Sequence, residues 1–148
     1  MKLTKRVLMR RAKPVDFTWP FQNYILAQKM TAFMQQHKGI GLAAPQIGER
    51  FRLFVMLIDG RQRWCFNPEI MESSTVLTEY NEGCLSFIGD QCTITRPDWV
   101  KVTYQNYQGE AEEHTLTGLE ARCFQHELDH LEGITMWDRY KEQHAEQS

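Results

Sequence analysis

The sequence predicts a single α+β domain in which two helices flank a region of short β-strands. Apolar residues recur at helical spacing in two segments, near residues 20–37 and 118–131, and short β-rich pieces fill the region between about 51 and 116. The chain has 148 residues, which is the size of one domain. No internal repeat, low-complexity tract or Gly/Ser linker divides it, so residues 1–148 are assigned to one compact domain.

The composition excludes several classes of protein. With 42% hydrophobic and 24% charged residues, the chain is typical of a globular protein. A net charge of -2 gives no overall electrostatic reason to bind nucleic acid or an anionic membrane. The longest apolar run, Leu53–Ile58, is far shorter than the roughly 20 residues that span a bilayer. We therefore expect no nucleic-acid partner and no membrane segment, and the lack of a secretory signal pattern favours the cytoplasm.

The first helix is expected at about 20–37. Pro20 suits its first turn, and apolar side chains recur at near-helical spacing until Gly39. The β-rich region that follows contains turn-forming pairs such as Asp59-Gly60, Asn67-Pro68 and Arg96-Pro97. In this region we expect strands at Phe51–Ile58, Trp64–Ile70, Thr75–Thr78, Cys92–Thr95 and Val100–Tyr107.

The second helix is expected at about 118–131. Thr117 and Glu120 have the spacing of a capping box, and Gly133 suits the C-terminal stop. Apolar residues lie on most faces of this helix, so it is expected to be buried. The polar residues after it are expected to form a frayed tail.

An H-E-x-x-H string lies on the second helix. His126 and His130 are four residues apart, so their imidazoles lie one above the other and can bind one metal ion. Glu127 lies beside them, where it can take a proton from a water molecule. A hydrogen-bonded pair of core histidines is the alternative. A catalytic metal site normally has three protein ligands, so the third ligand decides the class of enzyme.

The elongated zinc-protease motif would require a third histidine where Met136 stands. Cys123 lies three residues before His126, but it is about 10 Å from His130 along the helix axis, so three ligands on this helix would hardly converge. The four cysteines form no C-x-x-C pair, and in a reducing compartment we expect thiols. A loop cysteine is the better candidate, and Cys84 in the sequence EGCLS is one. A turn with a buried thiol is the alternative.

A third unusual segment, GIGLAAPQ, occupies residues 39–46. It lacks the G-x-G-x-x-G spacing, which argues against nucleotide binding. A packing loop of small residues after the first helix is one interpretation. The other is that Gln46 supplies a neutral amide donor to a developing oxyanion.

Together and in this order, three motifs resemble those of the peptide deformylase family: GIGLAAPQ at 39–46, EGCLS at 82–86 and QHELDH at 125–130. The resemblance implies a compact α+β fold in which the helix that carries the H-E-x-x-H string packs against small antiparallel sheets. It also implies a metal ion bound by Cys84, His126 and His130. It implies proton transfer by Glu127. It also assigns Gln46 and the backbone N–H of Leu85 to the oxyanion of the transition state.

The same resemblance implies a hydrolase that removes the formyl group from N-formylmethionyl peptides and releases formate. Fe²⁺ is the implied metal in the cell, although two histidines and one cysteine would also hold Zn²⁺ or another divalent ion. The residues implied to contact substrate, most of them around the methionine side chain, are Ile40, Gly41, Gly83, Leu85, Leu119 and Cys123.

Many bacterial members of this family continue into a longer basic helix that contacts the ribosome. Residues 141–148 form only a short segment that is not basic, so we expect at most transient ribosome contact. We also expect a monomer. Two other functions share some of these features. One is a metallopeptidase built on the same helix, and the other is a binding module in which the metal is structural.

Glu82 and Arg96 flank the cysteine loop and the strand that follows it. An arginine can hold a carboxylate by two charge-assisted hydrogen bonds, so we predict that the two side chains pair and restrain the loop. The alternative is that Glu82 is a solvated loop residue.

Overall fold

The computed structural model describes residues 1–3, 11–83 and 91–144. The larger sheet has the strand order β1-β2-β3-β6-β7, and β4 and β5 form a separate hairpin; all pairs are antiparallel. The elements are α1 (Pro20–Gln36), β1 (Gly41–Ala43), the 3₁₀ helix η2 (Ala44–Ile47), β2 (Leu53–Ile58), β3 (Arg61–Ser73), β4 (Leu77–Gly83), β5 (Gln91–Pro97), β6 (Trp99–Gln105), β7 (Ala111–Thr117), α2 (Gly118–Leu131) and α3 (Met136–His144).

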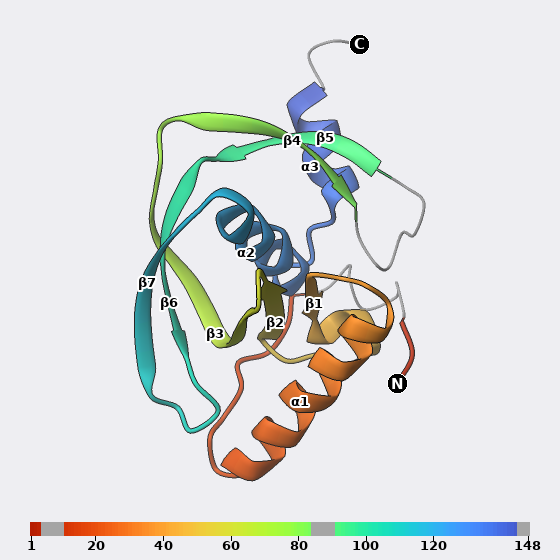
Figure 1. The fold of residues 1–148 in the computed structure, drawn as a ribbon, viewed down its shortest axis with the longest axis vertical. Helices are drawn as coiled ribbons and strands as arrows, with labels where there is room; N and C mark the ends of the chain where they lie inside the picture. The colour runs from red at the N-terminus through yellow and green to blue at the C-terminus, as the bar shows by residue number, and fades with distance from the viewer. Residues whose placement is uncertain (4–10, 84–90, 145–148) are drawn as a thin grey trace.

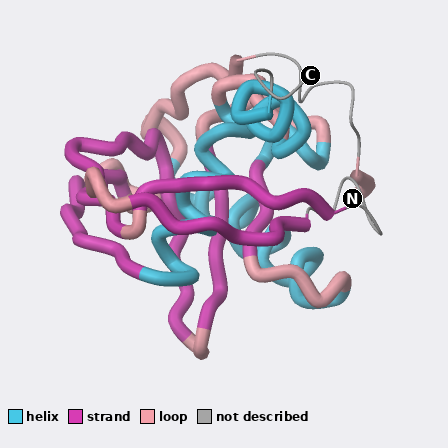
Figure 2. The backbone as a smooth tube through the Cα atoms, turned by 90° about the horizontal axis from the view of Figure 1, so that it is seen from above, coloured by secondary structure: helices cyan, strands magenta, loops and turns pink. Residues whose placement is uncertain are grey.

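Helix α2 occupies the middle of the domain (Figure 1). It contacts strands of the larger sheet and also β5 of the hairpin, while α1 packs against β1 and β2. Seen from above, helices and strands form one packed unit rather than two separate bodies (Figure 2). The predicted α+β class is confirmed. None of the helices that the structure describes is long and apolar enough to cross a membrane.

Strand β2 is buried on both faces, which explains the longest apolar run in the sequence. Phe54 and Met56 belong to the core cluster that includes residues of α2. Leu53 and Val55 alternate with them and belong to the cluster that includes residues of α1. A strand covered on both faces has no polar face to present, so its apolar residues run without interruption.

The turn from β2 to β3 is the predicted one. Asp59 and Gly60 both have positive φ angles, 51° and 76°, as expected for the two central residues of a tight hairpin turn.

Asn67-Pro68 lies inside β3, as it does in the strand expected at Trp64–Ile70, although such a pair is typical of a turn. β3 continues through it to Ser73, with a shift of register between Phe66 and Glu69. Asn67 has a φ of 50°, and its side chain hydrogen-bonds both the N–H and the carbonyl of Val15. These features are those of a β-bulge, where a proline is tolerated because one residue leaves the ladder.

The bounds of α2 agree with prediction, but its N-terminal cap does not. The Thr117 side chain makes no cap hydrogen bond. Glu120 instead accepts a hydrogen bond of 2.8 Å from Arg63 on β3, so a contact across the core replaces the local one. Beyond the helix, Gly133 has a φ of 78°, which fits its expected place in the C-terminal turn.

Residues 136–144 form a helix, α3, rather than the predicted frayed tail. Thr135 and Asp138 cap each other reciprocally at the start of α3: the Thr135 N–H donates to the Asp138 carboxylate, and the Asp138 N–H donates to the Thr135 hydroxyl. The helix then packs against β5 in a small apolar cluster of Cys92, Ile94, Met136, Trp137 and Tyr140.

Four other elements were not predicted or were misplaced. β1 and η2 lie within the GIGLAAPQ segment, and β7 pairs with β6 along its whole length. The strand expected at Thr75–Thr78 begins at Leu77 and continues to Gly83. β4 therefore runs directly into the EGCLS motif.

Candidate active site

Two histidines on α2 face one another inside the domain. His126 and His130 are both buried, and their Nε2 atoms lie 3.2 Å apart. Two nitrogen ligands of one tetrahedral ion, each about 2.0–2.1 Å from it, are about 3.3 Å apart. The observed separation therefore fits a pair of ligands to one ion. Burial, the other imidazole and Arg96 hold the pKa of His130 well below its usual value, so this ring is neutral, as a ligand must be.

Glu82, at the end of β4, orients the ring of His126. Its Oε1 lies 2.8 Å from Nδ1 of His126. Burial opposes the charge of Glu82, but hydrogen bonds from His126 and Arg96 outweigh it and lower the pKa of Glu82 to about 2. The ionised carboxylate can only accept, so Nδ1 carries the proton and Nε2 is left to face a metal ion. A carboxylate behind a histidine ligand fixes both its tautomer and its orientation.

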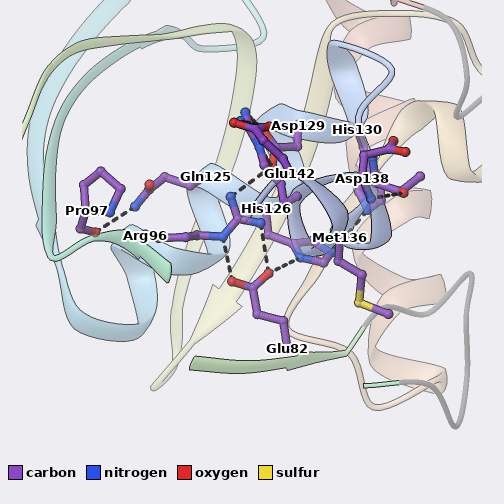
Figure 3. A network of polar contacts seen from close by, with 12 residues as sticks. Glu82, Arg96, Pro97, Gln125, His126, Asp129, His130, Met136, Asp138 and Glu142 are labelled. Atoms are coloured by element: carbon purple, nitrogen blue, oxygen red, sulfur yellow. Dashed lines mark hydrogen bonds and ion pairs between the residues drawn. The ribbon is translucent and has the colours of Figure 1, made fainter. Parts of the chain in front are cut away.

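Arg96 holds Glu82 in place from β5 (Figure 3). Its Nε donates to one carboxylate oxygen at 2.6 Å and its Nη2 to the other at 3.0 Å. The predicted pair of Glu82 and Arg96 is thereby confirmed. Arg96 also donates from Nη1 to Asp129 of α2 at 2.9 Å, a partner that was not predicted.

The carboxylate of Glu127 lies against the backbone of β1. A Cβ atom added to Gly41 would be 2.7 Å from Oε2 of Glu127, so a side chain at residue 41 would displace this carboxylate. Burial raises the pKa of Glu127 to about 7, with His126 acting in the opposite direction. Among the described residues, Oε1 of Glu127 has no hydrogen-bond partner. Glu127 is thus a buried acceptor next to the histidine pair.

Cys123 lies in the same region, on the helix that carries the two histidines. Its Sγ lies 3.8 Å from the carbonyl oxygen of Ile40 and would be 2.7 Å from a Cβ on Gly41. Burial, with Glu127 adding to it, raises the pKa of this thiol well above its usual value. Without a metal ion beside it, this thiol is therefore uncharged, and it belongs to the apolar core cluster that also contains Phe124.

Three of the other residues expected to contact substrate lie near Cys123 in the structure or on the same helix. Ile40 and Gly41 precede and begin β1, and Leu119 lies one turn before Cys123 on α2. Ile40 is 42% and Leu119 44% exposed, which is unusual for large apolar side chains beside a buried site. Gly83 ends β4, where it pairs with Gln91.

Gln46 is held rigidly on η2. It is only 1% exposed, and its Oε1 accepts a hydrogen bond of 2.8 Å from the N–H of Ala43. This bond fixes the direction of the amide, because the oxygen faces β1 and the NH₂ group becomes the donor end.

Cys84 and Leu85, the expected third ligand and oxyanion donor, lie outside the described residues. Within the described ranges, no set of three His, Cys, Asp or Glu side chains is placed to bind one ion. The chain does bring Glu82 to His126 two residues before Cys84 in sequence. Asp129 and Arg139 are polar residues of the site that sequence reasoning missed.

Known proteins with similar sequences and folds identify the family of this chain. The family profile described as polypeptide deformylase matches residues 1–146. The peptide deformylase of Thermotoga neapolitana is 45% identical over 136 residues, which cover 91% of this chain and 82% of that protein. Peptide deformylase 2 of Shewanella oneidensis is 42% identical, with 77% of this chain and 68% of that protein covered.

Solved structures show the same fold. The crystal structure of the peptide deformylase from Thermotoga maritima matches with a TM-score of 0.88 and 39% identity, over 94% of this chain and 97% of that one. A probable peptide deformylase from Synechococcus phage S-SSM7 matches with a TM-score of 0.86 and 35% identity, over 94% and 97%. The three motifs, the profile and the fold agree, and the chain therefore belongs to the polypeptide deformylase family of enzymes.

Proposed function

We propose that this enzyme is a metal-dependent amide hydrolase that removes the formyl group from N-formylmethionyl peptides and releases formate. The observation that carries the proposal is the buried histidine pair on α2, whose Nε2 atoms lie 3.2 Å apart, with Glu127 beside it. Membership of the peptide deformylase family supports the substrate class.

We propose Cys84, His126 and His130 as the metal ligands. A set of two imidazoles and one thiolate suits Fe²⁺ in the cell, and Zn²⁺ or another divalent ion in a purified sample. An ion bound there would polarise the formyl oxygen and lower the pKa of a water molecule. Glu82 would keep the His126 ring turned towards the ion through its hydrogen bond to Nδ1.

Glu127 would move the proton. Its carboxylate accepts a proton from the attacking water and gives it to the peptide nitrogen as the bond from the formyl carbon to that nitrogen breaks. One water is consumed, and formate and a free amino terminus are formed. Because water is the nucleophile, we expect no acyl-enzyme.

The oxyanion that forms on the formyl oxygen needs hydrogen-bond donors. The NH₂ group of Gln46, fixed by the bond from Ala43 N–H to its other end, would be one donor. The backbone N–H of Leu85 would be the other. A donor of this kind favours the transition state by about 2–4 kcal/mol.

The methionine side chain would occupy an apolar pocket near Cys123. Ile40 and Leu119 present exposed apolar surface there, and Cys123 stays an uncharged thiol. Gly41 allows close approach to β1, and Gly83 and Leu85 would contact the peptide from the other side.

We also propose that the enzyme acts as a monomer in the cytoplasm, with at most transient ribosome contact. Helix α3 carries Arg139 and Lys141 against Asp138 and Glu142, so its charges cancel and it offers no basic surface for RNA.

The test is turnover by the metal-loaded protein of a formyl-methionyl peptide, with the acetyl-methionyl peptide as matched control. We expect equal amounts of formate and new amino termini from the first substrate and little reaction with the second. Cleavage at an internal bond of an unformylated peptide would instead indicate a metallopeptidase. No turnover by a protein that holds its metal tightly would indicate a binding module with a structural ion.

A further inference from the structure

The polar network of the site does not end at Arg96. Asp129 lies between two arginines, and both donate to its carboxylate. Arg96 reaches Oδ2 from Nη1 at 2.9 Å, and Arg139 reaches Oδ2 from Nε at 3.1 Å and Oδ1 from Nη2 at 2.9 Å. Arg139 belongs to α3, which packs against β5 of the hairpin. The network therefore connects α3 to the site.

The contacts form an unbroken chain from α3 to a proposed metal ligand. Its members, in order, are Arg139, Asp129, Arg96, Glu82 and His126. The two arginines balance the two carboxylates, so the chain is neutral when His126 is neutral. Glu82, Arg96 and Asp129 are all buried, where each charge depends strongly on its partner.

We propose that Arg139 is a positioning residue for the metal ligand His126, acting through Asp129, Arg96 and Glu82. This inference rests on the proposed function, because it takes His126 to be a ligand. It assigns α3 a role in metal binding in addition to its packing against the hairpin.

The physical reason lies in the shared guanidinium of Arg96. Two of its nitrogens hold Glu82 and the third holds Asp129. A guanidinium is planar and rigid, so it cannot move towards one partner without leaving the other. Without Arg139, Asp129 would keep only the bond from Arg96 and would draw that group towards itself. The hydrogen bonds from Arg96 to Glu82 would then weaken, and Glu82 would fix the orientation of the His126 ring less firmly.

Helix α3 has other attachments, which makes the proposal testable. Met136, Trp137 and Tyr140 pack with the apolar residues of β5. Gln143 exchanges two hydrogen bonds with the backbone of Thr95, at 2.8 and 2.9 Å. These contacts do not involve Arg139, so we expect α3 to stay docked when Arg139 is replaced.

The experiment measures the dissociation constant of Zn²⁺ by competition with a chromophoric chelator, for the wild type and three variants. Arg139→Met should weaken binding about tenfold, the lower end of the range for residues that support a ligand from behind. Arg139→Lys keeps the charge but not the two-pronged contact, and it should show a smaller loss.

Glu142→Gln is the matched control. Its carboxylate lies 3.5 Å from Nη1 of Arg139 and is 70% exposed, so the variant removes a surface partner of Arg139 but leaves the contact with Asp129. Its Zn²⁺ affinity should equal that of the wild type.

A second readout separates positioning from simple stabilisation. The Co²⁺-loaded protein has visible absorption bands that depend on ligand geometry, and these should shift in Arg139→Met at saturating metal but not in Glu142→Gln. Wild-type affinity together with an unchanged cobalt spectrum in Arg139→Met would overturn the proposal, whatever happens to thermal stability.

If Arg139→Met does not fold, Arg139→Lys decides: weakened Zn²⁺ binding supports the proposal and wild-type binding overturns it. Failure of the wild type to bind Zn²⁺ or Co²⁺ would be a different result. It would refute the proposed function itself.

Discussion

At the scale of single residues, the carboxylate of Glu127 occupies space that is free only because residue 41 is a glycine. A Cβ on Gly41 would lie 2.7 Å from both Oε2 of Glu127 and Sγ of Cys123. Both atoms are at the ends of side chains, so they can move at little cost in stability. Replacing Gly41 should therefore affect catalysis more than the stability of the fold.

Gly41→Ala should reduce kcat while the protein still binds metal and folds. Displacing a proton-transfer group by about 1 Å can cost on the order of a hundredfold in rate. Gly41→Ala combined with Cys123→Ala should recover part of the loss, because the new methyl group can then move towards the space left by the thiol. Steady-state kinetics of the single and double variants check this. An unaffected kcat in Gly41→Ala would show that the carboxylate does not need its observed place.

Glu127→Gln should separate proton transfer from metal binding. The amide has nearly the same shape but cannot accept the proton, so kcat should fall by about 10²–10⁴. Metal content should stay that of the wild type, because Glu127 is not proposed as a ligand. Metal analysis beside the kinetics makes the distinction. Turnover near that of the wild type would remove Glu127 from the proposed mechanism.

The residues of the site differ in how far the sequence could predict them. His126, Glu127 and His130 follow from local geometry, since any helix brings residues four apart together. Asp129 and Arg139 do not, because their pairing depends on where α3 docks. Glu120 is a similar case. Sequence spacing predicted that it would cap its own helix, but its carboxylate pairs with Arg63 on β3, a contact that depends on the tertiary fold.

At the scale of elements, the β4–β5 hairpin directs the charged side chains of Glu82 and Arg96 towards α2. In its register Glu82 is opposite Cys92, and Thr78 is opposite Arg96. Arg96 must therefore reach along the hairpin to meet Glu82, which a long side chain with a forked end can do. The pair ties the end of β4, just before the EGCLS cysteine, to the same helix that carries the histidines.

A double-mutant cycle should show that Glu82 and Arg96 act together. Glu82→Gln and Arg96→Met each leave a buried partner without its counter-charge, so each should reduce kcat/KM. The double variant leaves neither charge and should lose less than the sum. We expect a coupling energy of about 1–3 kcal/mol, against about 0.3–0.5 kcal/mol or less for independent sites. Additive losses would mean that the observed pair does not support the site.

Elements with strong local patterns were predicted well, and those that depend on neighbours were not. The bounds of α2 and the Asp59-Gly60 turn follow from periodicity and turn chemistry. β7 was missed because its sequence, AEEHTLT, has a single buried residue and is a strand by virtue of its pairing with β6. α3 looked like a tail because it is polar, although Thr135 and Asp138 carry the spacing of a helix start.

At the scale of the whole molecule, the proposed metal site lies where α2, which packs on the larger sheet, meets the β4–β5 hairpin. The larger sheet supplies the apolar support of α2, and the hairpin supplies Glu82 and Arg96. The proposed third ligand, Cys84, follows directly on the hairpin strand β4. An ion bound by α2 and by the chain after β4 would therefore fasten the hairpin to the rest of the domain.

Metal removal should lower the thermal midpoint of the protein measurably. An ion that binds only the folded state, at a free concentration about a hundred times its dissociation constant, adds about 2.7 kcal/mol to the free energy of unfolding. In a domain of this size, 1 kcal/mol corresponds to about 2–4 °C, so a chelator should lower the midpoint by about 5–10 °C. Readdition of Zn²⁺ should restore it. His126→Ala should show no such difference between metal-loaded and chelated samples, whereas Glu127→Gln should show the full one. Equal midpoints with and without metal in the wild type would mean that the ion does not bind the folded chain in the way proposed.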